Sequence, residues 1–457
     1  MNYNEILNNQ RAFFASNTTK NVKFRIDQLK KLKRILKENE PMLFEGINAD
    51  FGKSEFDTYL SEFSLIYHEL NSFIKHSKRW SKRERVATNF ANFPASSYII
   101  PEPLGNALII GAWNYPYQLS LIPAMAALAA GNTVILKPSE LPRRTSEIMA
   151  KLINENFEPE YFHVVEGGVP ETTALLEQRF DKIFFTGSTP VGKIVYQAAA
   201  KHLTPVTLEL GGKSPTFVLS DANIKMTVKR MVWAKFLNAG QTCVAPDYVL
   251  VENKIKDKFL KALQKEIEKY HPGDEEKSEN YTLIISERHF ERLNSLIDPK
   301  KVYCGGKVLS KEKRLMGPTV LSEVTFDDKV MQDEIFGPIL PVISFDNLDE
   351  VIKKVKEGEK PLSCYIYSKS KKRIDKILYE ISFGGGAIND SMMHLANSNL
   401  PFGGVGFSGM GHYHGKFGFK SFSHYKSILD KPFWYEAPVK YPPYSKLKMK
   451  LLKFLME

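Results

Sequence analysis

The sequence predicts an α/β protein with a doubly wound, mostly parallel sheet and a second α/β unit. Residues 107–110 form a continuous apolar segment of the kind that is buried in parallel sheets. A helix rich in small residues is predicted at 119–130, and a second apolar strand at 133–136. The same alternation of strand and helix continues to residue 201, which favours a doubly wound sheet whose ligand lies at the carboxyl ends of the strands.

The segment before this sheet is predicted to be helical over residues 3–85. Apolar residues recur there at helical spacing, in the stretches 24–36 and 60–74. Helical periodicity stops at residue 86, and residues 97–100 resemble a strand bounded by prolines. Because proline suits an edge strand or an extended arm, we expect residues 86–105 to leave the main unit.

A second alternation of strands and helices follows residue 209. Its predicted strands are 215–219, 248–251, 316–321, 339–343 and 363–367, and its predicted helices are 222–238, 254–270, 286–297 and 370–380. From about residue 421 the chain is strand-like, then proline-rich, and finally basic and apolar.

Size and composition favour a reducing, cytoplasmic setting. The chain has 457 residues, enough for two or three domains, and its three cysteines are too widely spaced for a disulfide framework or a C-x-x-C metal motif. The N-terminus lacks the apolar core of a signal peptide. The net charge is +11, but the basic runs are typical of solvated helix faces, and no nucleic-acid-binding motif accompanies them. We therefore expect no nucleic-acid partner.

Cys243 is the strongest single candidate for chemistry. Gly240 and other small residues flank it, so the backbone can pass close to a ligand, and Pro246 ends any helix through this turn. A cysteine thiolate is a good nucleophile once its proton is removed. The alternative is that Cys243 is a small buried apolar residue, which is also how we interpret Cys304 and Cys364.

Seven short motifs in this order resemble those of the NAD(P)-dependent aldehyde dehydrogenase superfamily, and most closely its class 3, which includes fatty aldehyde dehydrogenases. The motifs are Trp113-Asn114-Tyr115-Pro116, Lys137-Pro138-Ser139-Glu140, Phe185-Thr186-Gly187-Ser188, Glu209-Leu210-Gly211-Gly212-Lys213, Gly240-Gln241-Thr242-Cys243, Glu334-Ile335-Phe336-Gly337-Pro338 and Pro401-Phe402-Gly403-Gly404. The resemblance implies a Rossmann-type cofactor domain, a second α/β catalytic domain and a small β arm for oligomerisation.

The resemblance also implies an aldehyde-oxidising chemistry. Cys243 would add to the carbonyl of an aromatic or a medium- or long-chain aliphatic aldehyde, and hydride transfer to NAD(P)+ would leave a thioester. The Asn114 amide and the backbone N–H of Cys243 would stabilise the oxyanion. Glu209 matches the family's general base, which activates the water that releases the acid.

The cofactor is expected to be NAD, with NADP use also plausible. Lys137 and Glu140 match the family's pair at the adenine ribose, where a carboxylate repels a 2′-phosphate and the lysine partly offsets that repulsion. Residues 187–192 open a helix whose free N–H groups can face pyrophosphate. The full set of expected cofactor residues is Trp113, Lys137, Ser139, Glu140, Gly168, Thr186, Gly187, Ser188, Val191, Gly192, Leu210, Gly211, Glu334 and Phe336.

Other candidates carry less weight. Gly404, Gly406 and Gly409 spell G-x-G-x-x-G, but no strand–helix unit surrounds them, so we interpret the match as accidental. His412 and His414 could bind a metal, but no third ligand is near. We therefore expect no metal. The two histidines line the substrate entrance or simply pack, and with Tyr115 they are the candidate substrate residues.

Two other classes of protein compete with a dehydrogenase. A cysteine hydrolase or acyltransferase would share Cys243 and an oxyanion donor, although it would usually pair the thiol with a histidine. A non-catalytic protein with the same fold is the third class. Within the family, the thioester could also pass to coenzyme A, but Glu209 favours water.

The expected organisation is an NAD(P)-binding domain at 1–85 and 106–209, a catalytic domain at 210–417, and an arm at 86–105 and 418–440 that forms a homodimer. Residues 441–457 form a basic amphipathic tail, in which lysines interleave with apolar residues. This segment is too short to span a bilayer. It could pack on its own dimer and cap the substrate entrance, which we favour, or lie peripherally on an anionic membrane.

Overall fold

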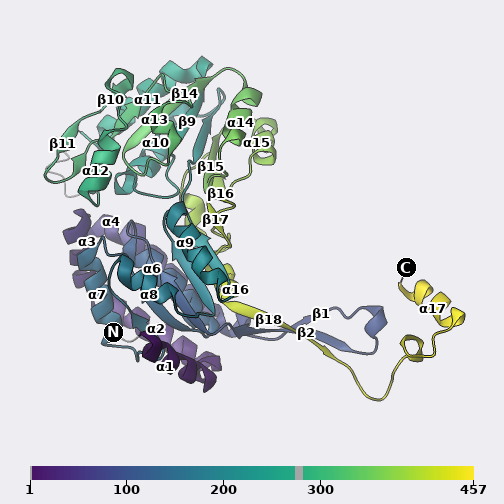
Figure 1. Ribbon diagram of the computed structural model, residues 1–457. Helices are drawn as coiled ribbons and strands as arrows, with labels where there is room; N and C mark the ends of the chain where they lie inside the picture. Colours follow the sequence, from purple (N-terminus) through teal and green to yellow (C-terminus); the bar gives the residue numbers. More distant parts are fainter. Residues whose placement is uncertain (1–2, 273–280, 457) are drawn as a thin grey trace.

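The molecule consists of two α/β units and a projecting antiparallel arm (Figure 1). The computed structural model describes residues 3–272 and 281–456; the side chains of Leu455 and Met456 lie outside this description, as does the whole of Glu457 in the predicted tail. The predicted fold class is confirmed.

Helices form the N-terminal part of the first unit. They are α1 (Tyr3–Ala15), α2 (Val22–Glu38), α3 (Glu40–Phe51), α4 (Glu55–Thr58), the π-helix η2 (Tyr59–Phe63) and α5 (Ser64–Trp80). The side chain of Asn21 caps α2 by accepting backbone N–H groups from Lys23 and Phe24. The helical prediction to residue 85 was wrong at its end. Glu84–Val86 is strand β1, because it pairs with β2, a contact that local periodicity does not encode.

The first sheet has the order β17-β7-β6-β3-β4-β5. Its strands are β3 (Asn106–Ile110), β4 (Thr133–Lys137), β5 (Phe162–Val164), β6 (Lys182–Thr186), β7 (Val206–Glu209) and β17 (Gly409–Met410), and only β17 runs antiparallel to its neighbour. Along β3, Ala107 and Ile109 enter one hydrophobic cluster while Leu108 and Ile110 enter another. Both faces of the sheet are therefore buried, which explains the continuous apolar run.

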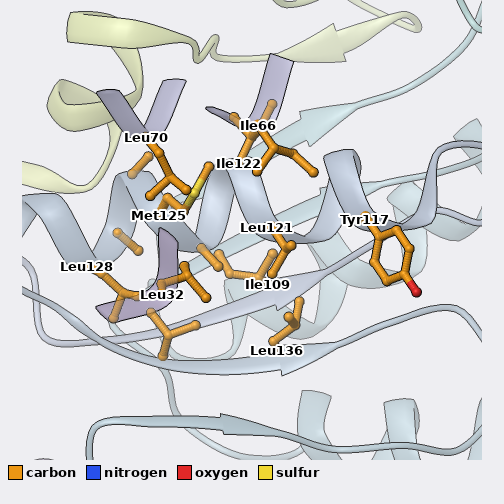
Figure 2. Packing of buried hydrophobic residues seen from close by; sticks show 14 of the residues in the cluster. Leu32, Ile66, Leu70, Ile109, Tyr117, Leu121, Ile122, Met125, Leu128 and Leu136 are labelled. Atoms are coloured by element: carbon orange, nitrogen blue, oxygen red, sulfur yellow. The ribbon is translucent and has the colours of Figure 1, made fainter. Parts of the chain in front are cut away.

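Four helices, α6 (Pro116–Ala130), α7 (Arg143–Asn154), α8 (Val169–Leu176) and α9 (Thr189–Ala200), connect these strands. Every residue of α6 is buried, and Figure 2 shows Leu121, Ile122 and Met125 packed between the sheet and α2 and α5. The helix starts three residues before its predicted start, because Glu62 accepts the backbone N–H groups of Tyr117 and Gln118.

The second unit is built on a sheet with the order β10-β13-β14-β9-β8-β15-β16. Its strands are β8 (Pro215–Val218), β9 (Tyr248–Glu252), β10 (Val302–Cys304), β13 (Thr319–Leu321), β14 (Ile339–Phe345), β15 (Ser363–Tyr367) and β16 (Gly385–Ile388). Its helices are α10 (Ile224–Phe236), α11 (Lys256–Tyr270), α12 (Glu287–Asn294), α13 (Lys329–Gln332), α14 (Leu348–Glu357) and α15 (Lys371–Glu380). Two separate hydrophobic clusters cover the two faces of this sheet.

One expectation for the second unit needs correction, and one helix was missed. The predicted strand 316–321 is two strands, because Leu315–Met316 (β12) pairs with Val308–Ser310 (β11) while β13 joins the main sheet beyond Pro318. Helix α14 was not predicted from the sequence.

The arm joins segments that are far apart in the sequence. Strand β2 (Ser96–Pro103) pairs along its whole length with β18 (Ser423–Asp430), and β1 pairs on the other edge of β2. Before the arm, the chain returns to the first unit through β17 and α16 (Gly415–Ser421), which packs beside α5 and α6. Figure 1 shows α17 (Lys446–Met456) at the far end of the arm. Among the described residues, no helix is long and apolar enough to cross a membrane.

The glycines of the G-x-G-x-x-G match form a tight turn that leads into β17. A Cβ on Gly404 would lie 2.0 Å from the backbone oxygen of Ser408, and one on Gly409 would lie 2.5 Å from that of Leu208. A Cβ on Gly406 would meet nothing closer than 3.8 Å, although its φ of +66° favours glycine. The match therefore reflects close backbone packing beside β7.

We predict that Gly404→Ala lowers the free energy of unfolding by about 2–4 kcal/mol, because the new methyl collides with a backbone carbonyl. Gly406→Ala is the matched control. It should cost only about 1–2 kcal/mol, since it meets strain in φ but no collision. Denaturant titration of both variants checks this. Equal losses for the two variants would contradict the packing account.

Candidate active site

A cavity of about 1900 Å³ lies between the two units. It runs along the carboxyl ends of β3, β4, β6 and β7 and is closed by residues of the second unit from the Cys243 turn, the Glu334 segment and α12. This is the edge at which open α/β sheets bind ligands.

The turn that carries Cys243 has an unusual backbone. Asn238, Ala239 and Gly240 in η4 (Leu237–Gly240) all have φ between +52° and +73°. A Cβ on Gly240 would lie 2.3 Å from the backbone oxygen of Gly337, so the position requires glycine. The Gln241 side chain donates to the backbone oxygens of Asn238 (3.1 Å) and Leu283 (3.0 Å) and accepts the N–H of Ile285. These bonds fix the direction in which Cys243 leaves the turn.

The loop between β3 and α6 is joined to this turn. The Asn114 side-chain amide donates to the backbone oxygen of Gln241 (3.1 Å), and the Asn238 amide donates to the backbone oxygen of Asn114 (2.9 Å). Next to them, the hydroxyls of Tyr115 and Thr242 lie 2.6 Å apart. The amide nitrogen of Asn114 carries a second N–H, so this loop can supply a donor close to Cys243.

The Cys243 thiol is half-buried, and its pKa is raised to about 12. Burial is the main cause, and the negative charges of Glu334 and Glu209 add to it. The backbone N–H groups of Cys243 and Val244 act in the opposite direction, because they stabilise the thiolate. In this state of the protein, the thiol therefore holds its proton at neutral pH.

Glu209 ends β7, and only 3% of it is exposed. Neither carboxylate oxygen has a hydrogen-bond partner in the part of the chain that the structure describes. Burial raises the pKa of this carboxyl well above its usual value. A buried carboxylate that lines a cavity without a partner can accept a proton from a bound molecule.

Glu334 reaches the same cavity from the segment after α13. Its carboxylate lies against the backbone of Gly211, where a Cβ would be 2.0 Å from Oε2. Burial and the charge of Asp247 raise the pKa of Glu334 to about 8, while the Gly212 N–H, Lys213 and Arg292 partly offset them. Two aromatic rings of the site, Trp113 and Phe336, meet edge to face, with their centroids 5.3 Å apart.

Three charged residues that the sequence analysis did not assign to the site hold the Glu334 segment. Lys213 Nζ donates to the Asp247 carboxylate (2.6 Å) and to the backbone oxygens of Val330 and Asp333. Asp247 accepts the N–H of Ile335 (3.0 Å), and Arg292 donates to the backbone oxygen of Ile335 (2.6 Å). Lys213 ends one recognised motif and Asp247 follows another closely, but nothing in the sequence shows that they meet.

The other end of the cavity lies at β4 and β6. Lys137 Nζ donates to the backbone oxygen of Pro138 (2.7 Å) and lies 3.8 Å from Glu140 Oε2, and burial lowers the pKa of this lysine. The Thr186 hydroxyl is buried and has no hydrogen-bond partner among the described residues. Helix α9 begins directly after Ser188, and the Ser188 side chain does not cap it.

Most of the predicted site residues line this single cavity. They are Trp113, Asn114, Tyr115, Lys137, Ser139, Glu140, Gly168, Thr186, Gly187, Ser188, Val191, Glu209, Leu210, Gly211, Cys243, Glu334, Phe336 and His414. Two do not line it. Gly192 is buried inside α9 and packs against Leu210, and His412 is exposed beside Phe417. In the described part of the chain, no group of three or more His, Cys, Asp or Glu residues is arranged to hold a metal ion.

The cavity fits a dinucleotide. At one end it offers a lysine, a carboxylate, an uncapped helix N-terminus and the Thr186 hydroxyl, and beside the thiol it offers the Glu209 carboxylate; neither Thr186 nor Glu209 has a side-chain hydrogen-bond partner among the described residues. A thiol, an amide donor and a carboxylate without a partner among the described residues, around a cavity of this volume, are groups that an enzyme with a dinucleotide cofactor and a thiol nucleophile can use.

Comparison with known proteins agrees with this class. The family model described as "Aldehyde dehydrogenase family" matches residues 2–428. The 4,4′-diaponeurosporen-aldehyde dehydrogenase of Staphylococcus aureus is 46% identical over 97% of this chain and 96% of its own, and the rat dimeric, NADP-preferring aldehyde dehydrogenase is 45% identical over 95% and 96%. A solved structure described as the substrate-bound state of Staphylococcus aureus AldH superposes with a TM-score of 0.97 over the whole of both chains, at 44% identity.

The chain belongs to the aldehyde dehydrogenase family, and class 3 members are among its relatives. It is an oxidoreductase that oxidises aldehydes with a nicotinamide dinucleotide. Family membership separates it from the hydrolase and the non-catalytic protein that the sequence left open.

We predict that Glu334→Gln lowers the pKa of Cys243, because it removes a negative charge that disfavours the thiolate. At pH 9, above the Glu334 pKa of about 8, the variant should be alkylated at Cys243 about three- to tenfold faster than the wild type. At pH 6.5, where Glu334 is already protonated, the two rates should agree. Mass spectrometry of the Cys243 peptide after iodoacetamide treatment measures both rates.

Glu287→Gln is the control, since Glu287 is exposed on α12. A pH-independent change in the alkylation rate of Glu334→Gln would point to altered packing and not to charge.

Proposed function

We propose that this enzyme oxidises aromatic or medium- to long-chain aliphatic aldehydes to carboxylic acids through a covalent bond to Cys243. The observation that carries the proposal is the convergence of the Cys243 thiol, the Asn114 amide and the unpaired Glu209 carboxylate on one cavity. The substrate class rests on the apolar wall of that cavity, to which Trp233, Leu237, Met392, Phe402 and Tyr413 contribute.

The first half of the reaction forms a thioester. The Cys243 sulfur bonds to the aldehyde carbon as a thiolate, after the thiol proton has passed to solvent. The second N–H of the Asn114 amide and the backbone N–H of Cys243 donate to the resulting oxyanion. As the C=O bond re-forms, the carbon loses a hydride and the thioester remains on Cys243.

The second half releases the acid. Glu209 removes a proton from water while the water oxygen bonds to the thioester carbon. The carbon–sulfur bond then breaks, and the thiolate of Cys243 is regenerated. The raised pKa of Glu209 makes it a stronger base than an exposed carboxylate, and it also means that turnover should rise with pH as Glu209 loses its proton.

The dinucleotide accepts the hydride when it is bound. Lys137, Ser139 and Glu140 would hold its adenosine half, residues 186–191 its pyrophosphate, and Glu334 and Phe336 its nicotinamide half. NAD is the expected cofactor because Glu140 opposes a 2′-phosphate. Lys137 Nζ lies 3.8 Å from Glu140 Oε2 and partly offsets the repulsion between Glu140 and a 2′-phosphate, so NADP should also act as cofactor.

We predict that Cys243→Ala abolishes aldehyde oxidation, by about 10⁴-fold or more, while dinucleotide binding persists. Glu209→Gln should instead keep a burst of NADH and lose steady turnover, because the thioester forms but is not hydrolysed. Absorbance at 340 nm with octanal and benzaldehyde, each with NAD and with NADP, measures both effects and the cofactor preference.

Cys304→Ala is the control for the cysteine, since Cys304 lies on strand β10 and does not line the cavity. Near-normal oxidation by Cys243→Ala, or a normal steady rate of Glu209→Gln over a wide pH range, would reject the roles assigned here.

We further propose that the arm forms a homodimer and that α17 packs on that dimer. Two observations support this proposal: the long pairing of β2 with β18, and the exposed apolar side chains Phe433, Trp434, Leu447 and Phe454. Because lysines interleave with apolar residues along α17, a peripheral contact of this helix with an anionic membrane is the competing outcome.

We predict that the full chain runs as a dimer in light scattering at micromolar concentration, about twice the 52.1 kDa chain mass, and that truncation after Pro443 weakens it. Packing of α17 on the dimer also predicts no binding to anionic vesicles. Salt-sensitive vesicle binding that the truncation abolishes would favour the membrane instead, and a monomeric full chain would reject the dimer.

A further inference from the structure

A buried ion pair lies behind the Asn114 loop and has no part in the reaction described above. Lys53 follows α3, and Glu62 belongs to the π-helix η2. Their side chains are 1% and 0% exposed, and Lys53 Nζ lies 3.9 Å from Glu62 Oε1. Moving two charges out of water costs desolvation free energy, so an ion pair this deep in the protein needs a physical explanation.

Glu62 holds the start of helix α6. Its Oε2 accepts the backbone N–H groups of Tyr117 (2.8 Å) and Gln118 (3.0 Å). The residue at the helix N-cap, Tyr115, makes no side-chain cap of its own, so the carboxylate from η2 takes that place. Negative charge is also favourable at a helix N-terminus.

Lys53 holds the residue just before that helix. Its ammonium lies 4.7 Å from the ring centroid of Tyr115 and 4.9 Å from that of Phe51, both within the range of a cation–π interaction. The ring of Tyr115 is thus fixed from behind by Lys53 and at its hydroxyl by Thr242, 2.6 Å away.

These contacts lead to the two segments that carry Asn114 and Cys243. Asn114 precedes Tyr115, and Thr242 precedes Cys243. The ion pair of Lys53 and Glu62 therefore holds the segment that carries the amide donor against the turn that carries the thiol. The same π-helix places Leu60 and Ser61 in the wall of the cavity. π-Helical turns occur often at functional sites.

We propose that Lys53 and Glu62 are positioning residues that hold Asn114 and Tyr115 in place for stabilising the oxyanion formed at Cys243. This inference rests on the proposed function of Asn114 and Cys243. The two charges act as a unit, because loss of either one leaves the other buried without its partner.

The test compares Lys53→Met in the wild type and in Asn114→Ala. In the wild type, kcat for aldehyde oxidation should fall about ten- to hundredfold, as expected for a misplaced oxyanion donor, while the dissociation constant for NAD stays within about twofold. In Asn114→Ala the same change should lower kcat by less than about twofold, because the donor that it positions is already gone. Equal losses in both backgrounds, or no loss in the wild type, would overturn the proposal.

Lys182→Met is the matched control for the removal of a buried lysine. Lys182 lies at the start of β6 and donates to the Thr207 hydroxyl (2.8 Å), and it does not line the cavity. Its variant should keep kcat within about twofold of the wild type. If Lys53→Met alone does not fold, Lys53→Met with Glu62→Gln removes both charges and keeps an acceptor oxygen for the N–H groups of α6.

Hydrolysis of p-nitrophenyl acetate separates this proposal from the proposed function. Ester hydrolysis also acylates Cys243 through an oxyanion, but it requires no dinucleotide. A wild-type protein that hydrolyses the ester but oxidises none of the aldehydes would contradict the proposed substrates, and a parallel loss of ester hydrolysis in Lys53→Met would still support the positioning role. Ester hydrolysis unchanged by Lys53→Met would overturn it.

Discussion

The hydrogen bonds of the Asn238 amide hold the site together. This side chain donates both to the backbone oxygen of Asn114 and to that of Gln241, so one group joins the first unit to the turn that carries Cys243. The turn includes two non-glycine residues in the left-handed region, Asn238 and Ala239, at a cost of about 1–2 kcal/mol each. Backbone strain of this kind persists only where surrounding contacts hold the residues in that conformation, and it is common at reactive sites.

Burial then sets the electrostatics of the cavity. It raises the pKa of Cys243, Glu209 and Glu334 together, because burial disfavours the charged form of each acid. A low local dielectric also strengthens any hydrogen bond from Asn114 to a developing negative charge. The fold therefore places three acids with raised pKa values close to the donors that stabilise an anion once one forms.

Pairing between distant segments completes the walls of the site. Strand β17 adds to the edge of β7, and the backbone oxygen of Ser408 accepts the N–H of Leu210 directly after Glu209. Glu62 and Glu69 lie seven residues apart on η2 and α5, and they accept the backbone N–H groups of Tyr117, just after the Asn114 loop, and of Gly415, just after His414. One continuous helical segment thus sets the distance between the Asn114 loop and the loop of His414.

The sequence by itself determined the fold class, the order of the βα units and the motif residues of the site, because hydrophobic period, glycine turns and short motifs are local properties. Only the tertiary structure decided that Glu209 has no partner among the described residues, that Gly192 packs against Leu210, and that His414 but not His412 lines the cavity. It also brought Lys53 and Glu62 to Tyr115 and α6, and made a strand of residues 84–86. These outcomes depend on contacts between segments far apart in the chain, which no local pattern records.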